Sequence, residues 1–145
     1  MRQALCLLTV GIYYLLPFTF ERTMNTRVRK KLIQVARGRA HLMSFQNLIQ
    51  EAELGLNLEN SYEKSQLNEV IDEISEAEHA AGRPLLSALV RVKGRQNQGD
   101  SFFKLCERLG YGDWKSLKKD HEFLEEQRQT CREFWQDSKN FSSYL

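Results

Sequence analysis

The sequence lacks the cysteine patterns that build common metal and redox sites. Its three cysteines, Cys6, Cys106 and Cys131, lie far apart and form no C-x-x-C pair. A structural zinc site is therefore not expected, because such sites usually take paired ligands at short spacing. An odd number of scattered thiols is typical of a reducing compartment. We expect small apolar cysteines within helices, no metal and no cofactor.

The chain also lacks a strong net charge, internal repeats and low-complexity linkers. A formal charge of +2 over 145 residues is too small to indicate a nucleic-acid partner by itself, and the length suits one domain. The charges are instead arranged in blocks. Residues 24–41 are basic without any acid, residues 50–80 are strongly acidic, and residues 83–108 are again mainly basic. Such blocks predict surfaces of opposite potential.

Charged side chains are absent from residues 3–20, which are strongly apolar. This length is near the lower limit for a membrane-spanning helix, and the segment lacks the small-x-small cleavage pattern of a signal peptide. Alternatively, Met24 is the true start and residues 1–23 are a mis-assigned leader. We expect a single domain over residues 24–145, located in the cytoplasm. A membrane contact is expected only if residues 3–20 are retained as an anchor.

The first half of the domain carries apolar residues at helical spacing, separated by capping and stop residues. These patterns predict three helices, which run from the N-cap Thr26 to Gly38, from Ser44 to Gly55, and from Asn60 or Ser61 to Gly82.

The second half begins with an apolar stretch whose alternation predicts a strand over residues 85–92. A loop follows, and residues 101–103 either return as a short strand or begin a helix that ends at Gly110. A last helix is expected from Asp113 to about Asp137. The predicted fold is mainly α with a small β-hairpin. It is winged-helix-like, with a three-helix core in which residues 45–81 form a helix-turn-helix pair, a wing over residues 85–103, and two C-terminal helices.

Two resemblances accompany this pattern. The stretch GRPLLSA at 82–88, followed by GDSFF at 99–103, resembles a family of small uncharacterised bacterial proteins that brings no established activity. More loosely, VARGRAHLMSFQNLIQEAEL at 35–54 is similar to the helix-turn-helix entry of alkyltransferase-like DNA-binding proteins. Those proteins carry a Pro-Cys-His-Arg active-site stretch, which this chain lacks, so alkyl-transfer chemistry is not implied.

The candidate recognition helix has the wrong charge for reading the major groove of DNA. It carries Glu69, Asp72, Glu73, Glu76 and Glu78 and has no Lys or Arg between residues 65 and 82, so phosphates would be repelled. A backbone or minor-groove contact remains open, as does contact with a protein partner. The candidate contact residues are Arg91, Lys93, Arg95, Asn97 and Gln98 of the wing, with Arg27, Lys30 and Lys31 of the first helix.

The GRP tripeptide is interpreted as a helix stop. Gly82 can adopt the left-handed conformation that ends the third helix, and Pro84 prevents its continuation. Arg83 would then lie near Glu78 and bond its carboxylate and the last carbonyl groups of the helix.

Enzymatic signals are weak. Glu69, Glu73, Glu76 and His79 share one helix stripe, but a di-iron site needs a second Glu-x-x-His motif, which the chain lacks. Ser87 has no G-x-S-x-G elbow around it and is interpreted as structural. The sequence therefore favours a non-enzymatic binding module, acting through an unknown protein partner or through self-association. The alternatives are sequence-nonspecific nucleic-acid binding through the basic hairpin and, last, a cryptic hydrolase.

Overall fold

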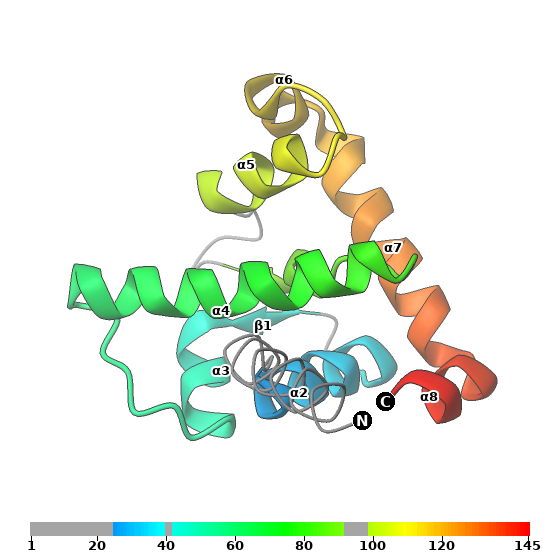
Figure 1. Cartoon of the computed structure of the whole chain (residues 1–145), viewed down its shortest axis with the longest axis horizontal. Coiled ribbons are helices and arrows are strands. Elements are labelled where there is room, and N and C mark those ends of the chain that lie inside the picture. The colour runs from blue at the N-terminus through cyan, green and yellow to red at the C-terminus, as the bar shows by residue number, and fades with distance from the viewer. Residues whose placement is uncertain (1–24, 40–41, 92–98) are drawn as a thin grey trace, which may run out of the picture.

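The computed structural model describes residues 25–39, 42–91 and 99–145, and this part of the chain is mainly helical with one small β element, as predicted (Figure 1). Its elements are α2 (Thr26–Arg37), β1 (Met43–Ser44), α3 (Phe45–Glu51), α4 (Ser61–Ala80), the 3₁₀ turn η1 (Leu86–Leu89), β2 (Val90–Arg91), α5 (Asp100–Arg108), α6 (Trp114–Lys119), α7 (His121–Gln136) and α8 (Ser138–Tyr144).

Side-chain caps set the helix starts, mostly where the sequence predicts them. The Ser44 hydroxyl accepts from the Asn47 amide, and the Asn60 side chain accepts from the amides of Tyr62 and Glu63. The prediction for α2 is wrong by one residue. Asn25, and not Thr26, is its N-cap, and the Asn25 side chain accepts from the Val28 amide. Both residue types are good caps, so the sequence alone does not separate neighbours.

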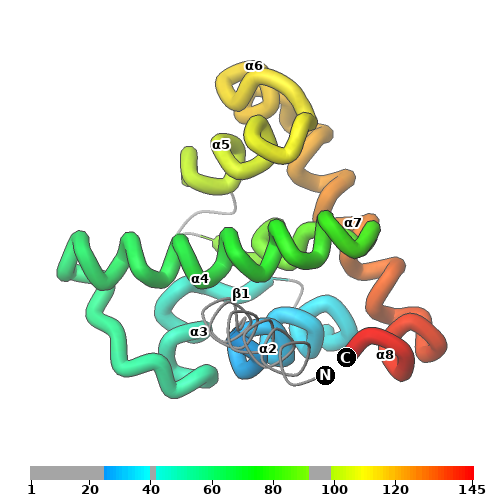
Figure 2. The backbone as a smooth tube through the Cα atoms, in the orientation of Figure 1, coloured from blue at the N-terminus to red at the C-terminus, as the bar shows by residue number. Residues whose placement is uncertain are grey.

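The apolar side chains form two cores. The main core gathers residues of α2, α3, α4 and the second half of α7, including Leu32, Leu67 and Trp135. The second core joins α5 to the start of α7 through Phe102, Phe103, Cys106, Phe123 and Leu124. Figure 2 shows α5 and α6 on one side of α4, with α2 and α3 on the other. The helix α7 extends from α6 to α8 and contributes to both cores.

The stretch from Leu85 to Val90 lies between the two cores, and here the strand prediction is wrong. Leu86, Leu89 and Val90 face the main core, whereas Leu85 and Ala88 belong to the second. Residues that face the same core lie three positions apart, Leu85 with Ala88 and Leu86 with Leu89, and this is the spacing of a 3₁₀ turn. The segment accordingly folds as a 3₁₀ turn over Leu86–Leu89, and only Val90–Arg91 is extended.

The hairpin and wing predicted over residues 85–103 are also wrong. The strand β2 pairs in parallel with β1, with Met43 opposite Val90, and residues 101–103 belong to α5. Phe102 and Phe103 are both buried in the second core, and adjacent buried residues suit a helix better than a strand with one solvent-exposed face. The predicted helix-turn-helix pair has both helices, but residues 52–60 connect them, which is longer than the usual turn of about three or four residues.

The single helix expected from Asp113 to Asp137 is divided at Asp120. Asp113 does cap α6, but Asp120 is extended, ends α6 and caps α7 by accepting from the Glu122 amide. An aspartate is a poor residue for a helix interior and a strong N-cap, which explains the break.

Across the described ranges, none of the helices has the length and apolarity needed to cross a membrane. Residues 1–23, the expected leader, lie outside these ranges.

Candidate functional site

The structure places only part of the basic surface that the sequence predicts. Arg27 and Lys30 are exposed on α2, Lys31 is half-buried there, and Arg91 is half-buried in β2. The remaining candidates, Lys93, Arg95, Asn97 and Gln98, lie outside the described residues. A common contact surface for all these side chains remains a prediction.

The GRP tripeptide ends α4 in a Schellman motif. Gly82 has φ +75°, its amide donates to the His79 carbonyl at 3.0 Å, and the Arg83 amide donates to the Glu78 carbonyl at 2.8 Å. These two bonds satisfy carbonyl groups that the helix end would leave without partners. The turn also directs the Arg83 side chain back along α4.

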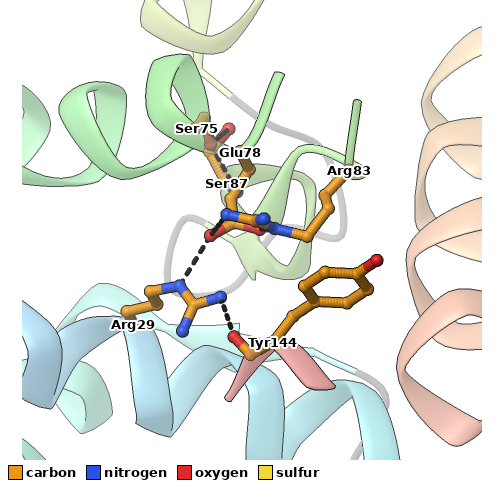
Figure 3. A network of polar contacts seen from close by, with 6 residues as sticks. All are labelled: Arg29, Ser75, Glu78, Arg83, Ser87 and Tyr144. Carbon is orange, nitrogen blue, oxygen red and sulfur yellow. Dashed lines mark hydrogen bonds and ion pairs between the residues drawn. The ribbon is translucent and has the colours of Figure 1, made fainter. Parts of the chain in front are cut away.

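Arg83 meets Glu78 there, but a second arginine from a distant helix reaches the same carboxylate (Figure 3). Arg83 Nε lies 2.5 Å from one Glu78 oxygen, and Arg29 Nε of α2 lies 2.6 Å from the other. The Glu78 side chain is fully buried, and those of Arg29 and Arg83 are 9% and 18% exposed. Each charge therefore depends on its partners, because an isolated buried charge is very costly.

The C-terminal helix α8 lies against this buried network. Arg29 Nη2 donates to the Tyr144 carbonyl at 2.6 Å, and the Arg83 guanidinium lies over the Tyr144 ring at 5.3 Å (Figure 3). Arg37 holds the preceding segment by donating to the Trp135 carbonyl at 2.8 Å while its guanidinium covers the Phe141 ring at 4.0 Å. The arginines of α2 and of the GRP turn thus fix the end of the chain.

Ser87 is joined to α4 by hydrogen bonds to Ser75. Its hydroxyl shares a 2.8 Å hydrogen bond with Ser75, whose hydroxyl also accepts from the Ser87 amide at 3.0 Å. The residues that lie near Ser87 in sequence are engaged elsewhere. Glu78 binds the arginines, and the His79 ring contacts the Tyr111 ring. The contacts of Ser87 thus favour the structural interpretation.

The two described cysteines are buried, and burial raises the pKa of each to about 12. The nearby charge of Asp72 adds to this effect at Cys106, and that of Glu78 adds to it at Cys131. Both thiols therefore stay protonated at neutral pH and are poor nucleophiles. Across residues 25–39, 42–91 and 99–145, no group of three or more His, Cys, Asp or Glu side chains is placed to hold a metal ion.

A cleft of about 230 Å³ lies where α4 faces the start of α5. Its apolar walls come from Phe45, Ile71, Val90 and Phe102. Its polar groups include Lys64, Asn68, Asp72, Ser87, Asp100 and Ser101. The volume is below the roughly 300–1,000 Å³ of most small-molecule sites.

Asp72 is the titratable group of this cleft with the most altered pKa. Burial raises the pKa of its carboxyl to about 6, and the charges of Glu76 and Glu69 act in the same direction. Arg108 opposes the rise through a 3.3 Å contact with Asp72. An acid with such a pKa gains from the approach of a further cation, which would stabilise its charged form.

The cleft borders an acidic surface on α4, which we define as the acidic face, Glu69, Asp72, Glu73 and Glu76. Glu69, Glu73 and Glu76 are exposed, and Arg108 reaches Glu76 at 3.5 Å. Its opposite side, with Leu67, Ile71 and Ile74, is buried in the main core, so the helix cannot rotate to hide the acids.

Compared with known proteins, the chain matches no family model, no curated protein sequence and no solved structure.

Sequence reasoning missed Arg29 and the cleft. A signal for Arg29 was present, because it lies four and seven residues before the buried Ile33 and Ala36, on the inner side of α2. No comparable signal marks the cleft, since its walls come from α3, α4, β2 and α5 and meet only in the folded chain.

Proposed function

We propose that this chain is a non-enzymatic binding module whose acidic face and adjoining cleft dock a basic segment of a protein partner. The proposal rests on the position of Asp72. This half-buried acid has a raised pKa, and it lies where the exposed carboxylates of α4 meet a cleft that is large enough for a side chain.

The chemistry of the cleft suits a lysine or arginine side chain. Its apolar walls can cover the aliphatic part of such a side chain, while Asp72 receives the charged end. The exposed carboxylates Glu69 and Glu73 attract further basic residues of the same segment and accelerate the encounter.

The test is the affinity for a fluorescently labelled lysine-rich peptide, measured by anisotropy at low salt. Asp72→Asn should weaken binding about tenfold, and Glu69→Gln with Glu73→Gln should weaken it to a similar extent. The matched control is Glu51→Gln, an exposed acid of α3, which should leave the affinity unchanged. Wild-type affinity should rise between pH 5 and pH 7, as Asp72 loses its proton. No binding, or equal binding by all variants, would refute the proposal.

A second candidate function, nucleic-acid backbone binding, is favoured by the exposed Arg27 and Lys30 on α2. Neither has a carboxylate within ion-pair distance among the described residues. A random-sequence DNA duplex should then bind at low salt, and Arg27→Ala with Lys30→Ala should reduce that binding, as should Arg91→Ala with Arg95→Ala. The exposed carboxylates of α4 must face away from the phosphates in such a complex.

We also propose that the module acts in the cytoplasm. The scattered cysteines support this location, and the two described thiols are buried and free. Fractionation of cells that express a tagged chain tests it, and recovery in the membrane or secreted fraction would contradict it.

A further inference from the structure

A second charged surface, of opposite sign, lies on α6 and the start of α7. Trp114, Lys115, Lys118, Lys119 and His121 line an open hollow of about 540 Å³, which we call the lysine hollow. The Trp114 ring forms its apolar part and has Lys104 Nζ at 5.0 Å and Lys115 Nζ at 5.7 Å from its centre. Cations are thus held around an aromatic surface.

The acids near the lysine hollow are mostly engaged in capping. Asp113 accepts from the Ser116 amide, Asp120 from the Glu122 amide, and Glu107 from the Trp114 amide. Asp100 is the exception and pairs with Lys118. In the part of the chain that the structure describes, Lys104, Lys115 and Lys119 lie within ion-pair distance of no carboxylate. The side chains that line the hollow therefore include three lysines and no carboxylate, and the capping acids, which keep their charge, lie outside that lining.

The acidic face of α4 complements this hollow in charge and length. Glu69 and Glu76 lie seven residues apart, about 10 Å along a helix, and the six-residue α6 is about 9 Å long. Glu69 and Glu73, like the three lysines, have no ion-pair partner among the described residues. The net charge of +2 is small, so two copies of the chain repel each other little as they approach.

We propose that the lysine hollow binds the acidic face of a second copy of this chain. This inference rests on the proposed function and names its partner, since the lysines of one copy are the basic segment that the other copy docks. The two contacting surfaces differ, so they form either a two-fold dimer with two equivalent contacts or a head-to-tail array. In both arrangements Trp114 is covered, and the contact is weakened by salt.

Charge reversal with mixing tests the contact. Lys115→Glu with Lys119→Glu makes the hollow acidic, and Glu69→Lys with Glu73→Lys makes the face basic. Sedimentation velocity of the wild type should show association at about 50 mM salt and a monomer at about 500 mM. Each double variant alone should associate at least tenfold more weakly, because its two surfaces then carry the same sign. An equimolar mixture of the two should associate again, which unfolded variants would not do.

A matched control places the same charge changes elsewhere. Lys139→Glu on α8 and Glu51→Lys on α3 change exposed side chains outside both surfaces, and each should associate like the wild type. A wild-type monomer at low salt, or a mixture that fails to associate, would overturn the inference. If the monomer still binds the lysine-rich peptide through Asp72, the proposed function stands and only the identity of the partner is wrong. If the wild type neither associates with itself nor binds the lysine-rich peptide, both the self-association and the proposed function are wrong.

Discussion

Glu78 is the carboxylate on which two arginines converge from different parts of the chain, and no solvent reaches it. Arg83 comes from the turn that ends its own helix, whereas Arg29 lies 49 residues earlier, on α2. The group therefore joins α2, α4 and the GRP turn, and through Arg29 it also reaches α8. Removing it would leave two nearly buried guanidinium groups without their carboxylate.

We expect Glu78→Gln to lower the free energy of unfolding by about 3–5 kcal/mol, since an uncompensated buried charge is strongly destabilising. Arg83→Lys should cost less, about 1–2 kcal/mol, because Arg29 still neutralises the carboxylate while the second contact of the guanidinium is lost. Chemical denaturation measures both. The control Glu73→Gln, an exposed acid on the same helix, should change stability by less than about 0.5 kcal/mol. If Arg83→Lys were as stable as the wild type, the contact between Arg83 and Glu78 would not stabilise the fold.

The sequence allowed half of this network to be predicted. Arg83 follows its helix directly and can only fold back on the last turn, so the contact with Glu78 is local. The partnership with Arg29 depends on how α2 packs against α4, which no local pattern records. The position of Arg29 on the inner side of α2 could be read from the sequence, but the identity of its partner could not.

Glu53 is the described non-glycine residue with a positive φ, at +54°. It occupies, after α3, the position that Gly82 holds after α4, and the Leu54 amide donates back to the Ile49 carbonyl. A side chain in this conformation costs about 1 kcal/mol relative to glycine. Glu53→Gly should therefore raise the thermal midpoint.

Gly82→Ala tests the same left-handed backbone conformation in the opposite direction, because it adds a side chain where Glu53→Gly removes one. A Cβ at Gly82 would meet no atom within 4 Å, so only backbone strain opposes it, and the midpoint should fall. Equal thermal midpoints for the wild type, Glu53→Gly and Gly82→Ala would show that a side chain at these left-handed positions causes no strain.

Asp72 links stability to pH with the opposite sign to most acids. Its pKa is about 6 in the folded chain against an ordinary 3.8, so between these values the folded state binds more protons than the unfolded state. The contribution of Asp72 to stability thus falls as pH rises from about 4 to 6. Asp72→Asn has no carboxyl group to ionise and therefore keeps its stability as the pH rises. It should be more stable than the wild type at pH 7.5, by about 1–2 kcal/mol. Denaturation at pH 4 is the internal control, where the advantage should shrink. An equal difference at both pH values would contradict the raised pKa.

At the scale of elements, α8 is held by contacts from outside itself. It has no fully buried residue, and its anchor is Phe141, half-buried against the main core beneath the Arg37 guanidinium. Phe141→Ala should release α8 without unfolding the remaining helices. Trypsin should then remove residues 140–145 by cleaving after Lys139, faster than in the wild type, as seen by mass spectrometry. Tyr62→Ala, at a 70% exposed aromatic residue, is the control and should leave the cleavage rate unchanged.

Most helix starts and stops were predictable because they depend on neighbouring residues. The predicted stop of α3 at Gly55 is wrong, because the helix ends at Glu51 and Glu53 takes the left-handed position after its C-cap. Ser44, Asn60, Asp113, Gly82 and Gly110 each act on the adjacent turn of backbone, as the sequence predicted. The 3₁₀ turn was not predictable, because a buried strand and a turn buried between two cores can have the same pattern of apolar residues in the sequence. Likewise, the pairing of β2 with β1 depends on α3 and α4 returning the chain to the same place.

At the scale of the whole molecule, the two cores share η1 and α7. Leu85 and Leu86 are neighbours in sequence, yet one packs in the second core and the other in the main core. Arg128 of α7 adds a 2.9 Å hydrogen bond to the Ala88 carbonyl, at the boundary between them. Opening the second core would therefore disturb a segment that the main core needs, and the two should unfold together.

The two tryptophans of the chain report on this coupling, because Trp135 is buried in the main core and Trp114 packs against the second. We expect Trp114→Phe and Trp135→Phe each to unfold in one transition, with the remaining fluorescence and the far-ultraviolet circular dichroism changing at the same denaturant concentration. Trp135→Phe should be the less stable variant, since it alters a fully buried side chain. Within each variant, however, the two signals should coincide, and this comparison does not depend on the absolute stability. If Trp114 fluorescence changed at a lower denaturant concentration than the helical signal, the second core would unfold independently, and the shared segments would not couple the two.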